Sequence, residues 1–350
     1  MILAYILKEE FWNESYLAPD SSVVLNLNPF FVLEESPDPK IANDPIRRAS
    51  MLCFTAIKLA SELHFERLTP DLFRGRPLCM DQFKALFATS RTPVHGQKDT
   101  IQTYPESTHV AVLCASQIYV FEALWKDFRV AVDEGDVVDI LSAIHSNANE
   151  TDPYEASQSA IGLLTSLGRN QWAIAREELA NTSKRNKDAL KLIDSALFVL
   201  VLDDYIPQNK HDAAANMLHG SYQLKNDEGN DKDAYQIGSC TNRWYDKLQI
   251  IVCGDGVTGI NFEHSAVDGH TALRFVSDIY AETIINFARS ITKNIHSNET
   301  VPNVINAEVK RAMAELDEAG RPAIDLAPRK ISFDLSESIK RTIFFAEVRI

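Results

Sequence analysis

Apolar residues recur at the spacing of a helix in several parts of the chain. Across residues 43–62 they fall on one face, and Pro45 suits the first turn after Asn43 or Asp44 as a cap. This pattern predicts a buried helix. Four more stretches share the periodicity and are expected to be helical: residues 136–146, 170–180, 186–196 and 271–288.

Runs rich in β-branched and aromatic residues predict strands between these helices. Residues 109–114 and 117–124 are two such runs joined by Ala115 and Ser116, which indicates a hairpin. The run LFVLVL at residues 197–202 is short and wholly apolar. Such a run is typical of a strand that is buried on both faces.

A second hairpin is predicted in the last third of the chain. Residues 247–253 and 257–262 flank the turn sequence GDG at 254–256. The second strand of this hairpin would end just before His264.

Three further stretches complete the predicted organisation. Residues 221–233, SYQLKNDEGNDKD, are polar and charged, which predicts an exposed and mobile loop. Residues 301–327 are expected to form a crossover that contains a helix. Residues 330–335, KISFDL, would begin a new strand, and Ser336 a new helix. The mixture of helices and strands predicts an α/β (α+β) fold.

Composition leaves room for a core and limits the classes of partner. The chain has 350 residues, of which 45% are hydrophobic, enough for one large α/β domain or two of ordinary size. Its net charge is −14, and no basic cluster interrupts the acidic balance. This argues against a nucleic-acid-binding surface and against a surface for anionic membranes. No Gly-rich phosphate loop is found, so nucleotide hydrolysis is not supported.

Cysteine usage and the lengths of apolar runs favour a reducing, intracellular setting. The five cysteines are scattered, without a CxxC pair or a spacing suited to zinc. The first ten residues turn acidic after a short apolar run, unlike a signal or transit peptide. No apolar run reaches the roughly 18 to 20 residues of a membrane-spanning helix, so no transmembrane segment is expected.

One short stretch carries a candidate for catalysis: NFEHSAVDGHTA, residues 261–272. His264 is expected at the end of a strand, with Asp268 placed to reach back towards the loop. Gly269 would permit an unusual backbone angle or a close approach. Histidine has an unperturbed pKa of about 6.5 and is the natural general base near neutral pH. The pattern alone leaves two alternatives open, a base for acyl transfer or a structural histidine.

Five stretches resemble, in order, successive motifs of the choline/carnitine acyltransferase family. They are RGRPLCMDQFKALFATSRTP at 74–93, GLLTSLGRNQWA at 162–173, MLHG at 217–220, NRWYDKLQIIV at 242–252 and FEHSAVDG at 262–269. The likeness extends from EFWNESYL at 10–17 to APRKISFDLSESIKRTI at 327–343. DSSVVLNLNPFFVLEESP at 20–37 looks most like the fungal carnitine acetyltransferases. The connection before NRWYDK is longer than is usual in the family.

This resemblance implies two domains of chloramphenicol-acetyltransferase-like fold, each with a mixed β-sheet flanked by helices, and an active-site tunnel between them. Residues 1–326 would form the first domain, which carries the catalytic histidine. Residues 327–350 would begin a second, truncated domain. The family's downstream segments, which bind the coenzyme's phosphates and the carboxylate of carnitine, have no counterpart before residue 350. We therefore expect the chain alone to have little or no activity.

The resemblance also implies roles for individual residues. His264 would be the general base, and Asp268 would hold or stabilise its imidazole or form a structural salt link. Tyr16 would line the carnitine pocket, with Phe11 and Gly269 also at the substrate. Five residues would support the catalytic hairpin without touching substrate: Asn242, Arg243, Trp244, Asp246 and Lys247. No metal and no bound cofactor are expected, since coenzyme A and acyl-CoA would be substrates.

The implied function is exchange of a short acyl group, acetyl by likeness to the fungal branch, between coenzyme A and carnitine. Two alternatives stay open. One is a truncated, catalytically inactive domain that acts as a binding or interaction module. The other is the lipoyl-linked acyltransferase core of a dehydrogenase complex, against which PLCMDQ and NRWYDK count. The small-molecule partners would be carnitine and acyl-CoA, and a complete protein would be a monomer. We expect a cytoplasmic location, with mitochondria and peroxisomes left open.

Overall fold

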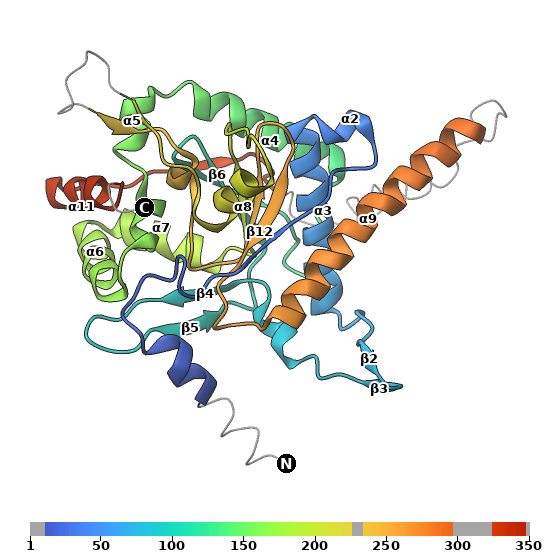
Figure 1. Ribbon diagram of the computed structural model, residues 1–350, viewed down its shortest axis with the longest axis horizontal. Coiled ribbons are helices and arrows are strands. Elements are labelled where there is room, and N and C mark those ends of the chain that lie inside the picture. The colour runs from blue at the N-terminus through green and yellow to red at the C-terminus, as the bar shows by residue number, and fades with distance from the viewer. Residues whose placement is uncertain (1–10, 226–233, 297–323, 348–350) are drawn as a thin grey trace.

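The computed structural model describes residues 11–225, 234–296 and 324–347 (Figure 1). At its centre is a seven-stranded mixed sheet with the order β1-β12-β11-β8-β6-β7-β13. Its strands are β1 (Phe30–Val32), β6 (His109–Cys114), β7 (Gln117–Glu122), β8 (Val199–Leu202), β11 (Gln249–Val252), β12 (Thr258–Asn261) and β13 (Arg329–Ile331). Smaller antiparallel pairs are formed by β2 (Leu72–Phe73) with β3 (Arg76–Pro77), β4 (Thr89–Thr92) with β5 (Thr100–Thr103), and β9 (Leu224–Lys225) with β10 (Tyr235–Gln236).

The central strand β8 runs parallel to both of its neighbours, β6 and β11. All four of its residues are buried. Val199 and Val201 pack into the core on one face of the sheet, whereas Leu200 and Leu202 pack into the core on the other. A strand covered on both faces needs an apolar residue at every position. The buried strand predicted from LFVLVL is therefore confirmed.

Both predicted hairpins are present. At the turn between β6 and β7, Ala115 and Ser116 have φ angles of 46° and 63°, as a two-residue type I′ turn requires. The turn between β11 and β12 contains Gly256 at a φ of 85°. A Cβ at Gly256 would lie 2.1 Å from the carbonyl oxygen of Ala42, so no larger residue fits without a backbone shift.

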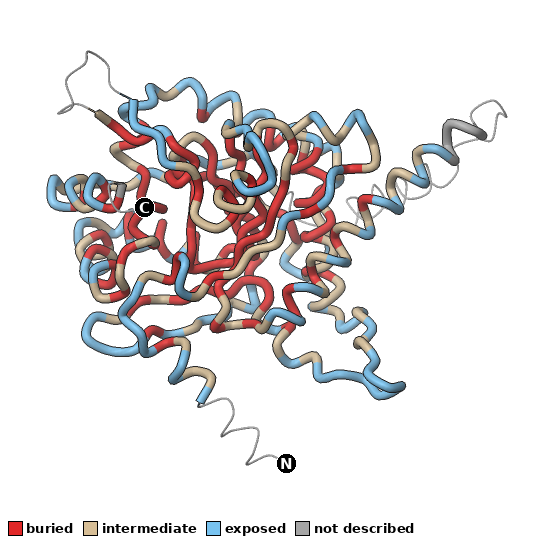
Figure 2. The backbone as a smooth tube through the Cα atoms, viewed as in Figure 1, coloured by how far each residue is buried: buried red, intermediate tan, exposed pale blue. Residues whose placement is uncertain are grey.

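Helices cover both faces of the sheet, and buried residues gather in the sheet and where the helices pack against it (Figures 1 and 2). One face packs against α3 (Pro45–His64), α4 (Glu134–Asn149) and α9 (Gly269–His296), and the other against α6 (Arg169–Thr182), α7 (Lys184–Ser195), α8 (Lys210–His219) and α11 (Glu337–Glu347). Shorter turns are α2 (Pro39–Ala42), α5 (Pro153–Ser157), η1 (Asp81–Ala85), η2 (Ile161–Ser166) and η4 (Ser239–Asn242). The five predicted helices and the predicted fold class are confirmed.

Side-chain caps explain where two of these helices begin. The carboxylate of Asp44 accepts a hydrogen bond from the backbone nitrogen of Arg47 at 3.0 Å, with Pro45 in the first position. Asp133 and Asp136 form a reciprocal capping box at the start of α4. Within the described ranges, no helix combines the length and the apolar character needed to cross a membrane.

Two predicted connections differ from the structure or lie beyond it. The mobile loop predicted at 221–233 contains the short strand β9 at Leu224–Lys225, which pairs with β10. Its polar composition hides this pairing, which rests on backbone hydrogen bonds. From residue 226 onward the loop lies outside the described residues, as does the crossover predicted at 301–327 up to residue 323.

Residues after 326 join the same sheet and core. β13 pairs antiparallel with β7, which places Ile331 opposite Ile118. The helix α11 buries Ile339 and Ile343 against η2 and α6. The division of the chain into 1–326 and 327–350 stays a prediction, and the contacts of this segment are with the sheet of the first predicted domain.

The turn between β6 and β7 should accept glycine more readily than serine. Ser116→Gly relieves the cost of a positive φ and should raise the free energy of unfolding by about 0.5–1 kcal/mol. Ser146→Gly, on the exposed side of α4, should lower it by up to about 0.5 kcal/mol. Urea unfolding of both variants checks this. Shifts of the same sign would contradict the strain inferred for the turn.

Candidate active site

His264 lies in the turn between β12 and α9. The antiparallel pairing of β12 with β1 and β11 ends at Asn261, so the chain leaves the sheet just before the histidine. The imidazole Nδ1 lies 2.9 Å from the carbonyl oxygen of Val267. Because a carbonyl oxygen only accepts, this contact requires the proton on Nδ1 and leaves a lone pair on Nε2. The geometry can therefore supply a general base at Nε2.

Two aromatic rings from the helical residues 11–17 stand beside this imidazole. Trp12 and Tyr16 are one helical turn apart, with ring centroids 4.5 Å from each other. Their ring centroids lie 5.7 and 5.3 Å from that of His264. The indole Nε1 of Trp12 donates a hydrogen bond to the carbonyl oxygen of Ser265 at 2.9 Å. Together the rings form an electron-rich wall next to the candidate base.

The structure separates the two aromatic residues predicted at the substrate. Tyr16 lies against His264, but Phe11 is 72% exposed on another side of the same helix. Trp12, which takes the place beside the imidazole, was not identified from the sequence. Its spacing of four residues from Tyr16 was the available signal, because residues four apart share one face of a helix.

Asp268 caps α9. Its Oδ1 accepts hydrogen bonds from the backbone nitrogens of His270 and Thr271 at 2.9 and 3.0 Å. The imidazole of His264 is instead oriented by the carbonyl of Val267. A catalytic role for Asp268 stays a prediction, since its described contacts are those of a helix cap.

Gly269 is the first residue of α9. It is not among the glycines with a positive φ, so the unusual backbone angle predicted for it is wrong. The reason is that the residue already lies in the first turn of a right-handed helix. A Cβ added to Gly269 would meet no atom within 4 Å. The described residues therefore give no steric reason for glycine, and a place at the substrate stays a prediction.

The residues predicted to support the hairpin are buried before β11. Arg243 binds Asp203 through two contacts, Nη2 to Oδ2 at 2.8 Å and Nη1 to Oδ1 at 3.1 Å. The Oδ1 of Asn242 accepts from the backbone nitrogen of Ser116 at 2.6 Å, and Trp244 is fully buried. These contacts join the start of β11 to the end of β8 and to the turn between β6 and β7.

Lys247 and Asp246 continue this buried segment. The Nζ of Lys247 donates to the backbone oxygens of Thr89 and Asp194 at 3.0 and 2.6 Å. Burial lowers the pKa of Lys247 to about 7. The Oδ2 of Asp246 accepts from the indole Nε1 of Trp172 at 2.8 Å. Both side chains face the interior.

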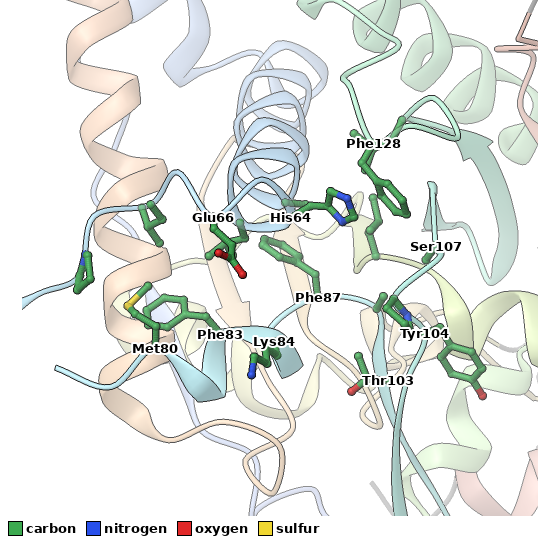
Figure 3. Close-up of a pocket in the computed structure, with 18 residues that line it drawn as sticks. His64, Glu66, Met80, Phe83, Lys84, Phe87, Thr103, Tyr104, Ser107 and Phe128 are labelled. Atoms are coloured by element: carbon green, nitrogen blue, oxygen red, sulfur yellow. The ribbon is translucent and has the colours of Figure 1, made fainter. Parts of the chain in front are cut away.

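A separate pocket of about 520 Å³ opens at the end of α3 (Figure 3). Phe83 from η1 and Met80 just before η1 line it, and the ring of His64 stacks on that of Phe128 with centroids 3.7 Å apart. His264 is not part of its lining. The candidate site is therefore the surface around His264 rather than this pocket.

The part of the chain that the structure describes contains no group of three or more His, Cys, Asp or Glu residues arranged to hold a metal ion. All five cysteines lie in the described ranges and form no disulfide, and four of them are buried.

Known proteins resemble this chain along nearly its whole length. It matches the sequence model of a family described as Choline/Carnitine o-acyltransferase over residues 7–350. It is 34% identical to the putative mitochondrial carnitine O-acetyltransferase of Saccharomyces cerevisiae, over 98% of this chain and 52% of that protein. Mitochondrial carnitine O-palmitoyltransferase 2 is 29% identical in Xenopus tropicalis, over 93% of this chain and 49% of that protein. The Homo sapiens carnitine O-palmitoyltransferase 2 is 30% identical, over 78% of this chain and 42% of that protein. The chain thus spans about half the length of these curated relatives.

Lys247→Met should change how stability depends on pH. Burial holds the pKa of Lys247 near 7, whereas lysine in an unfolded chain has a pKa of about 10.4. Between these values the unfolded state binds more protons, so the unfolding free energy of the wild type should rise with pH. The slope is at most about 1.4 kcal/mol per pH unit. Denaturant unfolding of both proteins at pH 6 to 10 measures it.

The informative quantity is the difference in unfolding free energy, wild type minus Lys247→Met. This difference should grow between pH 7 and pH 10, because methionine has no proton to lose. A difference that stayed constant over that window would show that Lys247 keeps its proton in the folded chain.

Proposed function

Because the chain belongs to the choline/carnitine O-acyltransferase family, we propose that it provides the catalytic base and one substrate wall for acyl transfer between coenzyme A and carnitine. The observation that supports this most is the orientation of the His264 imidazole. The carbonyl oxygen of Val267 accepts from Nδ1, which leaves Nε2 available as a base, and the rings of Trp12 and Tyr16 lie beside the imidazole. The proposal covers the activity of the whole protein, since the chain spans about half the length of its curated relatives.

The proposed reaction needs one proton to be moved twice. Nε2 of His264 takes the proton from the hydroxyl of carnitine while that oxygen attacks the carbonyl carbon of acyl-CoA. The tetrahedral intermediate then breaks its C–S bond, and the imidazolium returns the proton to the departing thiolate. The products are acylcarnitine and free coenzyme A, without a covalent acyl-enzyme. In reverse, His264 takes its proton from the thiol.

The aromatic pair supports carnitine as the acceptor. Carnitine carries a permanently charged trimethylammonium group, and aromatic faces attract such a cation by about 0.5–2 kcal/mol. Trp12 and Tyr16 offer two rings within one turn of helix beside the base. A choline substrate would satisfy the same rings, so the choice between the two acceptors rests on the names of the relatives.

We further propose acetyl as the acyl group. The yeast relative at 34% identity is named an acetyltransferase, whereas the two relatives at 29% and 30% are named palmitoyltransferases. The rate of transfer from acetyl-CoA, octanoyl-CoA and palmitoyl-CoA would distinguish these assignments. A cytoplasmic location is also kept as a proposal, and the yeast relative is named as mitochondrial.

The remaining site residues are proposed to act through structure. Asp268 sets the start of α9 and with it the turn that holds His264. Five buried residues are proposed to hold the β11–β12 hairpin without touching substrate: Asn242, Arg243, Trp244, Asp246 and Lys247.

His264→Ala should lower the rate of acyl transfer by about 10²- to 10⁴-fold, the usual contribution of a general base. The matched control is His270→Ala, six residues further along, whose exposed ring pairs with Asp71 at 3.3 Å. The assay is thiol release from acetyl-CoA with carnitine. It is run on the chain alone and on a fusion to the part of the yeast relative that the chain does not match. Equal activity of both variants would remove His264 from the mechanism.

Tyr16→Leu should raise the KM for carnitine by roughly 3- to 30-fold, the equivalent of a lost cation–π contact. The KM for acetyl-CoA should stay within about twofold. Phe11→Leu is the control, since its ring is 72% exposed and the ring contacts between this helix and His264 are made by Trp12 and Tyr16. If Phe11→Leu raised the KM for carnitine as much as Tyr16→Leu, the assignment of the wall would be wrong.

A further inference from the structure

A chain of buried ion pairs runs beneath the turn that carries His264. It links three carboxylates through two guanidinium groups, with every side chain at most 4% exposed. The four links are Glu263 Oε1 to Arg91 Nη1 at 3.2 Å, Arg91 Nε to Asp99 Oδ2 at 2.6 Å, Asp99 Oδ2 to Arg169 Nε at 2.5 Å, and Arg169 Nη1 to Asp246 Oδ1 at 2.8 Å. Residues 155 positions apart in sequence, Arg91 and Asp246, thus belong to one network.

At one end this network holds the turn around His264. Glu263 accepts four hydrogen bonds: from Arg91 Nη1 at 3.2 Å, Ser265 Oγ at 2.6 Å, Ser265 N at 3.0 Å and Ala266 N at 3.3 Å. Arg91 Nη1 also donates to Ser265 Oγ at 3.0 Å. The residues on both sides of His264 in sequence are therefore bound to one guanidinium group.

At its middle the network holds the aromatic wall. The backbone nitrogen of Asp99 donates to the carbonyl oxygen of Leu17 at 3.0 Å, at the end of helical residues 11–17. Ser265, which contacts Arg91, accepts the indole hydrogen bond of Trp12 through its carbonyl oxygen. Both connections lead from the guanidinium of Arg91 to the segment that carries the rings beside His264.

We propose that Arg91 is a positioning residue for the reaction proposed above. By bridging Glu263 and Asp99 it sets the distance between the imidazole of His264 and the rings of Trp12 and Tyr16. The base and the substrate wall come from segments about 250 residues apart, and their separation decides whether the hydroxyl of a bound acceptor meets Nε2. Arg91 itself touches neither substrate nor the imidazole.

The geometry requires arginine at this position. The planar guanidinium donates from Nε towards Asp99 and from Nη1 towards Glu263 and Ser265 at the same time. The ammonium of lysine is a single point of charge and cannot occupy both places. Arg91→Lys therefore keeps the positive charge in the network while it removes the bridge.

The alternative is that Arg91 only stabilises the fold, and Arg48 provides the control. Arg48 is also 1% exposed, and its Nη2 donates to the backbone oxygen of Glu34 at 2.9 Å. Leu33, next to Glu34, bonds to Thr258 at the start of β12, whereas His264 follows the end of that strand. Arg48→Lys thus perturbs a buried arginine at the far end of the strand that leads to the base.

The test uses the whole chain and does not need turnover. Nuclear Overhauser effects between the ring protons of His264 and those of Trp12 and Tyr16 are measured by NMR, with assignments from His264→Ala, Trp12→Phe and Tyr16→Leu. In Arg91→Lys these effects should weaken at least twofold, whereas in Arg48→Lys they should match the wild type. Asp99→Asn is the second variant, to be used if Arg91→Lys does not fold. It keeps the volume of the side chain and the backbone hydrogen bond to Leu17, and it should also weaken these Overhauser effects.

Activity then separates this inference from the proposed function. In a form of the protein that catalyses acyl transfer, Arg91→Lys should lower kcat about 10- to 100-fold. It should also raise the KM for carnitine and leave the KM for acetyl-CoA unchanged. Weakened ring contacts in a fusion that shows no acyl transfer would support the positioning role and count against the proposed function. Ring contacts that are unchanged in Arg91→Lys and Asp99→Asn, or equally weakened in Arg48→Lys, would overturn the positioning role.

Discussion

The carboxylate of Glu263 is buried directly beside the candidate base, and this constraint organises much of the site. An ionised carboxylate in a protein interior is costly unless cations and hydrogen-bond donors surround it. Arg91 and the backbone nitrogens of Ser265 and Ala266 satisfy it, and Arg91 in turn requires Asp99. Each buried charge needs a partner of opposite charge, so segments far apart in sequence come together under the turn. The family motifs around Arg91, Arg169 and Asp246 meet there as a consequence of charge compensation.

The sheet and its main helices follow from local patterns, because the signal and its cause lie close together in sequence. LFVLVL predicts β8 since a central parallel strand has two apolar faces. The turn at Ala115 and Ser116 is detectable from the two β-rich runs beside it. The pairing of β13 with β7 was not predicted, because a strand of three residues carries little pattern of its own and its partner lies about 210 residues earlier. Its place depends on the core that it helps to cover.

Only part of the candidate site was predicted, because here too the sequence shows local features and not long-range contacts. His264 stands out because its chemistry and its place at a strand end are both visible locally. Asp99, within the polar run GQKDT, resembles any loop residue, yet it is 2% exposed and paired with two arginines. Trp12 likewise resembles the other aromatic residues in sequence, and its contact with the imidazole of His264 forms only when the helical segment packs against a turn about 250 residues later in the chain. Long-range contacts between two polar residues, or between two aromatic rings, leave no periodic pattern in the sequence.

The partner that orients His264 has a chemical consequence. A carboxylate in that position could take up a proton, and the orientation of the ring would then depend on two titrating groups. The carbonyl of Val267 has no proton to gain near neutral pH, so it keeps Nδ1 as the donor while Nε2 is neutral and also after Nε2 becomes protonated. Asp268 is left to cap α9, which in turn holds the turn that presents Val267. In the proposed reaction, the imidazole would therefore take a proton from an alcohol or from a thiol without changing the hydrogen-bond partner of Nδ1.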